Sequence, residues 1–376
     1  MKKRVTLKVC IVLGGYLETG GIQTQSVELS RALAARGHEV RILCMGSRMP
    51  IPAGVMVDVI EKPFTMGVFS RIKRLYREGE LDIVHAQGCA GFNVMLNKIF
   101  QGVPFILTLH STAVSEYKVS QRTFWDKKYY ATFYLEEALP SHLANAVIAV
   151  SEYTAGAASR HYFVRRERIT VIPNGIDSSR FKDDGPCRKD GRTVLMVGRI
   201  DPRKGYMEFI DHVAPALVKR VPGIRINIVG GEFDNYREYT ERLKSRVVDN
   251  GLSDNVRFLG VIPFDELRQR YNSSDLFLLA SKEEGFGIVL LEAQCCGLPV
   301  VAFNNSGIRE AVDNGRSGLL VNTYEEMADA VAELMSDDKR RAEMGAAARA
   351  FAARFSWDSI AEQVEKVYER VINKGK

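Results

Sequence analysis

Two glutamates stand eight positions apart within residues 280–302, whose sequence is ASKEEGFGIVLLEAQCCGLPVVA. Glu284 precedes a Gly-Phe-Gly turn, and Glu292 follows about two helical turns into the next apolar run. Apolar runs on both sides predict a strand before the turn and another after the helix. A turn at the carboxyl edge of a parallel sheet, followed by a helix N-terminus, can hold a phosphate or sugar hydroxyls. The alternative is a pair of solvated surface glutamates.

A second motif places two cations beside glycines. The run 193–197 predicts a strand, and the sequence GRIDPRKG at 198–205 follows it. Arg199 offers a bidentate fork and Lys204 a point charge at a helix start, so together they could flank a diphosphate. Gly230 follows a further predicted strand and is expected to line the same site. Two unrelated surface cations are the alternative.

The first half of the chain carries a glycine-rich loop and a strand-end histidine. The loop GGYLETGGIQ at 14–23 is not G-x-G-x-x-G, so the dinucleotide fingerprint fails. His110 ends the buried run 103–109, where a side chain faces the ligand edge of a parallel sheet. His85 ends a similar run. A structural turn and a core or capping histidine are the alternatives.

Together these motifs resemble those of the retaining glycosyltransferases of family 4. E-G-F-G-x-x-x-x-E is similar to the family's E-x7-E motif, and GRIDPRKG is similar to G-R-x-x-x-x-K-G. VIPNGID at 171–177 and the segment 305–310 also resemble family markers. The resemblance implies an α/β fold of the GT-B type, with two Rossmann-like doubly wound parallel-sheet domains facing across a cleft.

The expected domains are 1–178, which would bind the acceptor, and 179–356, which would bind the nucleotide sugar. A C-terminal helix at 357–376 is expected to cross back to the first domain, and a polar linker is expected at 181–192. The 376-residue length suits two domains, since a single core rarely grows so large.

The resemblance also implies residue roles. Glu284 and His110 would contact the donor sugar, Glu292 would hold the ribose, and Gln23 would face the acceptor. The expected catalytic residues are Arg199, Lys204, Glu284 and His110. The expected donor-binding residues are Gly20, Gly21, Gly198, Arg199, Lys204, Gly230, Glu284, Gly285, Phe286, Gly287, Ile288 and Glu292.

The sequence lacks two common metal-binding motifs, D-x-D and C-x-x-C. No D-x-D pair occurs, so we expect neither a metal nor another cofactor, with the two cations stabilising the leaving phosphate. The cysteines form no C-x-x-C pair, which argues against structural zinc and favours a reducing cytoplasm. They are Cys10, Cys44, Cys89, Cys187, Cys295 and Cys296.

Charge is unevenly distributed along the chain. Residues 1–177 carry 22 Lys and Arg against 15 Asp and Glu, whereas the remainder carries 30 against 31. The basic half favours an anionic lipid-phosphate acceptor or membrane surface, although a solvated basic surface is the alternative. The segment 120–140 mixes aromatic and basic residues, so it could lie in a membrane interface or pack under the acceptor site. Apolar runs are only strand-length, so we expect no membrane span and no signal peptide.

The sequence therefore predicts a retaining, metal-independent transferase. Its donor would be a nucleotide diphosphate sugar, with UDP favoured and GDP as the alternative, and its acceptor a glycan or a lipid-linked molecule. The expected setting is surface polysaccharide or glycolipid synthesis in the cytoplasm or on the inner face of the plasma membrane, with no nucleic acid partner. A nucleotide-sugar epimerase and a non-catalytic binding scaffold are the alternatives.

Overall fold

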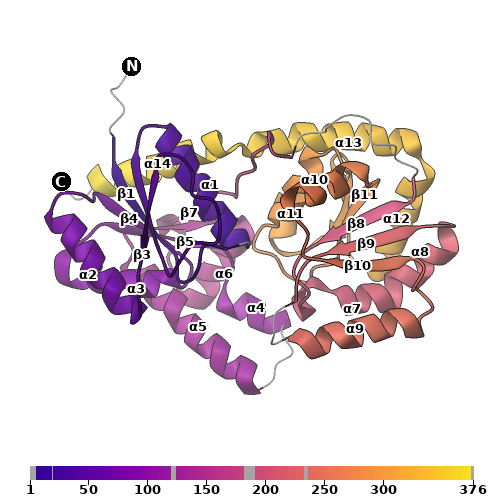
Figure 1. Cartoon of the computed structure of the whole chain (residues 1–376), viewed down its shortest axis with the longest axis horizontal. Helices are drawn as coiled ribbons and strands as arrows, with labels where there is room; N and C mark the ends of the chain where they lie inside the picture. The colour runs from indigo at the N-terminus through magenta and orange to yellow at the C-terminus, as the bar shows by residue number, and fades with distance from the viewer. Residues whose placement is uncertain (1–5, 19, 120–123, 182–190, 233–235, 374–376) are drawn as a thin grey trace. The chain divides into compact units, whose positions relative to one another are not determined.

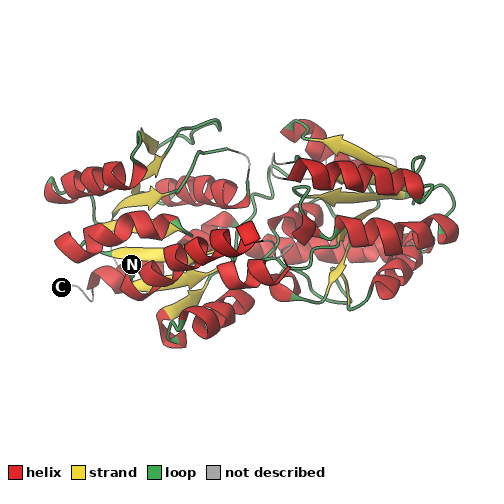
Figure 2. Ribbon diagram, turned by 90° about the horizontal axis from the view of Figure 1, so that it is seen from below, coloured by secondary structure: helices red, strands yellow, loops and turns green. Residues whose placement is uncertain are grey.

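The computed structural model describes residues 6–18, 20–119, 124–181, 191–232 and 236–373. The chain forms two compact units, and each is an α/β domain with helices over its sheet (Figures 1 and 2). The first unit contains Met1–Lys118, Arg122–Gly175 and Phe355–Lys376, and the second contains Ile176–Arg354 together with Val119–Gln121. Most of the linker expected at 181–192, including Cys187, lies outside the described residues.

The first unit is built on a seven-stranded, fully parallel sheet with the order β3-β2-β1-β4-β5-β6-β7. Its central strands are almost entirely buried and mostly apolar, as is usual where helices cover both faces of a parallel sheet. The strands are β1 (Lys8–Val12), β2 (Glu39–Cys44), β3 (Val55–Val59), β4 (Ile83–Gln87), β5 (Phe105–Leu109), β6 (Ala146–Ala149) and β7 (Ile169–Val171).

Two hydrophobic cores lie in the first unit, one against each face of the sheet. One core includes side chains from α1 (Gly21–Ala35) and α14 (Trp357–Asn373). The other includes side chains from α2, α3, α5 and α6. The helices on this second face are α2 (Phe64–Arg77), α3 (Ala90–Gln101), α5 (Phe124–Leu143) and α6 (Glu152–Tyr162), and the short α4 (Ala113–Val119) precedes α5.

The C-terminal helix α14 packs on the first unit, as expected. Glu365 accepts hydrogen bonds from Arg36 Nε at 2.7 Å and Nη2 at 2.8 Å, and it lies 2.9 Å from His38 Nε2. The hydroxyl of Ser356 accepts from the backbone N–H of Ser359 at 3.3 Å, which caps the start of the helix. These contacts join the last helix of the chain to the first.

His85 proves to be part of this core rather than a ligand residue. It lies inside β4 and is fully buried, with Nε2 2.6 Å from Thr108 Oγ1 and Nδ1 2.8 Å from the hydroxyl of Tyr368. Burial lowers its pKa to about 3, so the ring is neutral at neutral pH. The candidate role raised from its strand-end position is therefore wrong, because the strand continues past it.

The second unit has a six-stranded parallel sheet with the order β10-β9-β8-β11-β12-β13. Its strands are β8 (Thr193–Val197), β9 (Arg225–Val229), β10 (Val256–Gly260), β11 (Leu276–Leu279), β12 (Val300–Phe303) and β13 (Gly318–Val321). Its helices are α7 (Tyr206–Glu208), which continues through a π-helical segment into α8 (Ala214–Arg220), α9 (Arg237–Asp249), α10 (Phe264–Ser273), α11 (Ile288–Cys295), α12 (Tyr324–Ser336) and α13 (Asp338–Ala352). In both units the strand order reverses beside the first strand, which is where α/β folds bind ligands.

Among the residues that the structure describes, no helix has both the length and the apolar character needed to cross a membrane.

Candidate active site

The two motifs of the second unit meet at the carboxyl edge of its sheet. Glu284 lies in the loop between β11 and α11, and Lys204 lies in the loop after β8. Glu284 Oε1 accepts a hydrogen bond from Lys204 Nζ at 2.5 Å and another from Ser281 Oγ at 2.8 Å. The Lys204 and Glu284 side chains are only 16% and 14% exposed. A largely buried ion pair therefore joins the two loops that the sequence singled out.

Arg199 is held by a buried aspartate in the same β8 loop. The Asp201 side chain is 1% exposed, accepts from the backbone N–H of Arg203 at 2.9 Å, and lies 3.9 Å from Arg199 Nη2. Arg199 itself is 51% exposed. Its guanidinium thus lies near a buried carboxylate and is half exposed to solvent.

Glycines allow the loops of the second unit to approach each other at backbone distance. A Cβ on Gly230, which has a φ of +154°, would lie 1.8 Å from the carbonyl oxygen of Gly198. A Cβ on Gly205, with a φ of +70°, would lie 2.1 Å from that of Ala280. Neither position has room for a side chain, so the loops after β8, β9 and β11 form one close-packed group.

The turn before α11 combines a buried aromatic residue with partly exposed neighbours. Phe286 is 2% exposed, so its ring packs in the unit rather than facing solvent. Gly287 has a φ of +93° and leads directly into α11, which starts at Ile288. Gly285 and Ile288 are partly exposed. Helix α11 thus begins four residues after Glu284, at the turn that the sequence predicts to bind a ligand.

A third loop, after β12, fixes the backbone of Glu284. The N–H of Glu284 donates to Ser306 Oγ at 3.0 Å, and its carbonyl accepts from the N–H of Gly307 at 3.0 Å. Ser306 has a φ of +45°, a left-handed conformation unusual for serine. A Cβ on Gly307 would lie 2.0 Å from the carbonyl oxygen of Gly285. The segment 305–310 resembles a family marker in the sequence, but that resemblance gave Ser306 and Gly307 no role.

Glu292 lies in α11. The hydroxyl of Tyr271 donates to its Oε2 at 2.8 Å. Burial raises the pKa of Glu292, while the Tyr271 hydrogen bond and the charge of Arg180 act in the opposite direction. Glu292 is therefore a fixed hydrogen-bonding group in a low-dielectric position.

Three of the expected residues of the first unit lie at the start of α1. Gly20 precedes the helix, and its carbonyl accepts from the N–H of Thr24 at 2.8 Å. A Cβ on Gly20 would lie 2.4 Å from Gln23 Oε1, so the glutamine side chain folds back over this glycine. Gly21 is exposed and has open space where a Cβ would be. The structure thus brings Gly20 and Gln23 together.

His110 directly follows β5 and is partly buried. Its Nε2 lies 2.8 Å from Oε1 of Gln87 at the end of β4, so the ring donates this hydrogen bond. Burial lowers the pKa of His110 to about 4, so it is neutral at neutral pH. The expected position of His110 at a strand end is confirmed to within one residue, because β5 ends at Leu109. The ring is a neutral hydrogen-bond donor.

A buried acid supports the segment behind His110. Tyr162 donates to Glu137 Oε2 at 2.5 Å, and the N–H of Ala113, the first residue of α4, donates to the Tyr162 hydroxyl at 2.8 Å. Glu137 is 2% exposed, and burial raises its pKa to about 8. This pair was not anticipated, because a Glu within an aromatic helix pattern gives no sequence sign of burial.

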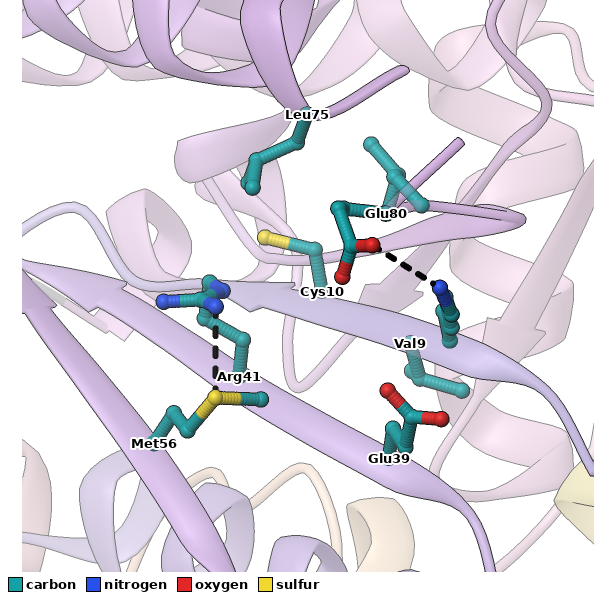
Figure 3. A pocket seen from close by; sticks show the side chains of 9 residues that line it. Val9, Cys10, Glu39, Arg41, Met56, Leu75 and Glu80 are labelled. Carbon is teal, nitrogen blue, oxygen red and sulfur yellow. Dashed lines mark hydrogen bonds and ion pairs between the residues drawn. The ribbon is translucent and has the colours of Figure 1, made fainter. Parts of the chain in front are cut away.

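The pocket in Figure 3 lies at the other end of the first sheet. It is lined by Lys8, Val9 and Cys10 of β1 and is bordered by the ion pair between Lys8 and Glu80 at 3.1 Å. Its volume is about 10 Å³, enough for no more than a water molecule. It is therefore not a substrate site.

Within the described residues, no three His, Cys, Asp or Glu side chains gather as a metal site. Sugar transfer without a metal ion stays a prediction. Among the described residues, Cys10, Cys44, Cys89, Cys295 and Cys296 form no disulfide.

Family models match both units of the chain. Residues 177–351 match the model described as "Glycosyl transferases group 1", and residues 19–180 match "Glycosyltransferase Family 4". A D-inositol 3-phosphate glycosyltransferase from Frankia alni is 30% identical over 395 residues, covering 96% of each chain. A GDP-mannose-dependent alpha-(1-6)-phosphatidylinositol monomannoside mannosyltransferase from Mycobacterium tuberculosis is 34% identical over 239 residues, covering 58% of this chain and 60% of the relative.

Solved structures share the fold at low sequence identity. Sucrose-phosphate synthase from Thermosynechococcus elongatus has a TM-score of 0.82 at 21% identity, covering 97% of this chain and 99% of the other. Anabaena HepE in complex with UDP and glucose has a TM-score of 0.78 at 21% identity, covering 97% and 100%. These similarities establish the GT-B fold.

Proposed function

This chain belongs to the family 4 glycosyltransferases, and we propose that it transfers a sugar from a nucleotide diphosphate sugar with retention of configuration and without a metal ion. The acceptor is a hydroxyl of a glycan or of a lipid-linked molecule. Relatives named for inositol phosphate and for a phosphatidylinositol mannoside support an acceptor rich in hydroxyl groups.

The observation that carries the proposal is the contact between Lys204 and Glu284. In a nucleotide sugar, the anomeric carbon is bonded directly to a phosphate oxygen. A site for this bond needs a cation to bind the phosphate, next to a group that accepts hydrogen bonds from the sugar hydroxyls. Here Lys204 Nζ and Glu284 Oε1 are 2.5 Å apart. Arg199, half-exposed in the same loop as Lys204, supplies the second cation. On binding, the phosphate would replace Glu284 beside Lys204, and the carboxylate would turn to the sugar.

These residues favour transfer by stabilising the leaving group. The bond between the anomeric carbon and the phosphate oxygen breaks, and a bond to the acceptor oxygen forms on the same face of the sugar. The acceptor proton passes to the departing phosphate oxygen, so the products are the glycoside and the nucleoside diphosphate. Arg199 and Lys204 stabilise the charge that develops on this phosphate. His110, neutral and oriented by Gln87, is assigned to the donor sugar.

The nucleoside is assigned to α11 and its surroundings. Glu292, held by Tyr271, would bind the ribose hydroxyls, and Gly198 and Gly230 would let the backbone approach the diphosphate. We favour UDP, with GDP as the alternative. HepE has been solved with UDP and with UDP-glucose, whereas one relative is named for GDP-mannose.

The test incubates the protein in EDTA with UDP-glucose, UDP-N-acetylglucosamine or GDP-mannose, and with D-inositol 3-phosphate or phosphatidylinositol as probe acceptors. The expected result is acceptor-dependent release of one nucleoside diphosphate, with an α-linked product by proton NMR coupling. An inverted linkage, or activity that needs added Mg²⁺, would overturn those parts of the proposal. Conversion of the donor to its epimer without acceptor would show an epimerase instead, and donor binding with no turnover would favour a scaffold.

A further inference from the structure

A groove of about 540 Å³ lies between helices of the second unit. One side is formed by the π-helical segment Phe209–Val213 together with α8, and the other side by α12, which packs against both (Figure 1). Small-molecule sites typically enclose ~300–1,000 Å³. The groove therefore has the volume of a ligand site, and the residues assigned to sugar transfer are not among those that line it.

Two alanines make room for the groove. Ala216 lies in α8 and Ala328 in α12, and a ring stands four positions before each of them: His212 on one side and Tyr324 on the other. Both helices follow strands of a parallel sheet and so run in the same direction, which puts the two rings at the same end of the groove. His212 belongs to the π-helical segment, a rare conformation that frequently occurs at functional sites.

The rings of His212 and Tyr324 form one wall of the groove. Their centres are 5.5 Å apart, and their planes are tilted by 35°. Behind Tyr324, the core residue Phe303 packs edge to face at a distance of 5.1 Å between ring centres. The Tyr324 ring is therefore held from behind, whereas the His212 side chain is exposed. The groove thus presents an aromatic wall that is fixed by the core.

Three polar groups of the groove have no hydrogen-bond partner among the described residues. They are the Tyr324 hydroxyl, the His212 imidazole and the Glu325 carboxylate. Partial burial raises the pKa of Tyr324 to about 12, so the hydroxyl keeps its proton at neutral pH and can donate. The ionised Glu325 carboxylate only accepts. The groove therefore offers a donor and an acceptor on adjacent residues.

The other charged groups that line the groove are already paired. Asp211 accepts a hydrogen bond from Arg246 Nε at 2.6 Å, and Arg220 forms an ion pair with Asp329. A phosphate or a nucleotide would meet Glu325 with no unpaired cation among the described lining residues to bind it. A small cation would gain little from a single exposed carboxylate, because exposed ion pairs contribute little. The charges therefore favour an uncharged ligand.

A sugar ring matches these groups. The C–H groups on one face of a pyranose pack against the electron-rich face of an aromatic ring. Its hydroxyls can donate to a carboxylate and accept from a phenol. We infer that the groove between α8 and α12 binds a neutral saccharide. This goes beyond the proposed function, because no residue assigned to the donor or to the leaving phosphate lines the groove.

The test titrates the methyl α-glycosides of D-glucose, D-mannose and D-galactose into the full chain and follows binding by saturation-transfer-difference NMR. Wild type should bind at least one glycoside saturably, with the strongest transfer at the C–H groups that face the rings. His212→Ala should weaken this binding about fivefold, because the exposed ring of the wall is lost. Glu325→Gln should weaken it by ~10-fold, because an amide accepts hydrogen bonds more weakly than a carboxylate.

Tyr324→Phe tests the hydroxyl alone, since the ring and its contact with Phe303 remain. It should weaken binding about threefold or more. The matched control is Glu238→Gln, which should bind as wild type does. Like Glu325, Glu238 is an exposed acid in the first turn of a helix of the second unit, but it lies in α9, outside the groove. Ala216→Leu narrows the groove from α8 and should also weaken binding.

Binding in the groove must be independent of the donor site. Arg199→Ala and Glu284→Ala should bind the glycoside as wild type does, and the groove variants should transfer sugar at the wild-type rate. These measurements separate a failure of this inference from a failure of the proposed function. Loss of binding in Glu284→Ala with full binding in His212→Ala would place the sugar in the donor site and overturn the inference.

Three other outcomes would also overturn it. Wild type could bind none of the three glycosides, or the groove variants, shown to be folded by thermal melting, could bind as wild type does. In the third outcome, glucose 6-phosphate displaces the bound glycoside at a lower concentration than glucose does, which would contradict the neutral ligand.

Discussion

The two units share one sheet plan but differ in how they hold polar groups at the carboxyl ends of their strands. In the second unit, backbone contacts made possible by Gly205, Gly230 and Gly307 lock the loops around Lys204 and Glu284. In the first unit, the segment after β5 is held instead by buried side-chain pairs: His110 with Gln87, and Glu137 with Tyr162.

Under the proposed function, this difference suits each unit to its part of the reaction. A backbone-locked loop group keeps charged side chains in place before a ligand arrives, which is what electrostatic stabilisation of a leaving group requires. Buried neutral pairs orient a histidine without placing a charge near it. The first unit also has large exposed apolar side chains on α3 and α5, among them Phe100 and Leu135.

The largest effect is expected for the cations of the second unit. Arg199→Ala and Lys204→Ala should each lower kcat by ~10²-fold or more, because the charge on the leaving phosphate loses a partner. Steady-state kinetics measure this, with Lys244→Ala, which removes an exposed cation of α9, as the control. Near-normal turnover in both variants would show that these two cations do not stabilise the leaving phosphate.

Gly307→Ala tests whether backbone packing holds the second site. The added Cβ would lie 2.0 Å from the carbonyl oxygen of Gly285, so the loop must shift. We expect a loss of stability of about 2 kcal/mol and a clear drop in donor affinity. Denaturant unfolding and calorimetry measure the two effects.

The matched control for this substitution is Gly156→Ala in α6. Nothing lies within 4 Å of its added Cβ, so stability should be unchanged or slightly higher. Equal behaviour of the two variants would show that the loops of the second unit tolerate movement.

Glu284→Ala should alter sugar selection more than nucleotide binding. Without the carboxylate, Lys204 loses its partner at 2.5 Å and is available to phosphate, so the affinity for bare UDP should not fall. Discrimination between donor sugars should drop by ~10-fold, because the carboxylate that accepts hydrogen bonds from the sugar hydroxyls is lost. Competition kinetics with pairs of donors measure this. A matching loss of UDP affinity would count against the assignment.

The smallest effect is a pH dependence in the first unit. The pKa of Glu137 rises from 4.5 to about 8 in the folded protein, so the folded state binds a proton that the unfolded chain releases. The stability contributed by the protonated acid is full below pH 4.5 and is lost as pH rises through about 8. Glu137→Gln removes this titration, so it should reduce the fall in melting temperature over this range.

Melting curves of Glu137→Gln across the range test this, with the exposed Glu78→Gln of the same unit as the control. An unchanged slope in Glu137→Gln would show that the buried pair does not govern the stability of the first unit.

Fold class and the motif residues of the second unit could be predicted from the sequence, because apolar runs and glycine-flanked charges recur at spacings that sheets and turns impose. The edge strands β3 and β13 and helix α2 were not identified. Strand β3 is only partly buried, so its apolar pattern is weak.

The support around the site is tertiary and leaves little trace in the sequence. Ser306 and Gly307 meet Glu284 across more than twenty positions, and Glu137 meets Tyr162 across 25. His85 was given a candidate role that it does not have. The strand was predicted to end at His85, whereas β4 continues to Gln87 and the histidine lies in the core. Local patterns indicate which residues end strands, but not which of them a neighbouring element covers.

The central claim is that Arg199 and Lys204 of the second unit form a metal-free diphosphate clamp. The most direct measurement compares the melting temperatures of wild type and Arg199→Ala with UDP, GDP, ADP and UMP, all in EDTA. The account predicts that one nucleoside diphosphate raises the melting temperature of wild type, that UMP does so much less, and that the variant loses the shift. A shift of equal size in the variant, or one that develops only with added Mg²⁺, would contradict it.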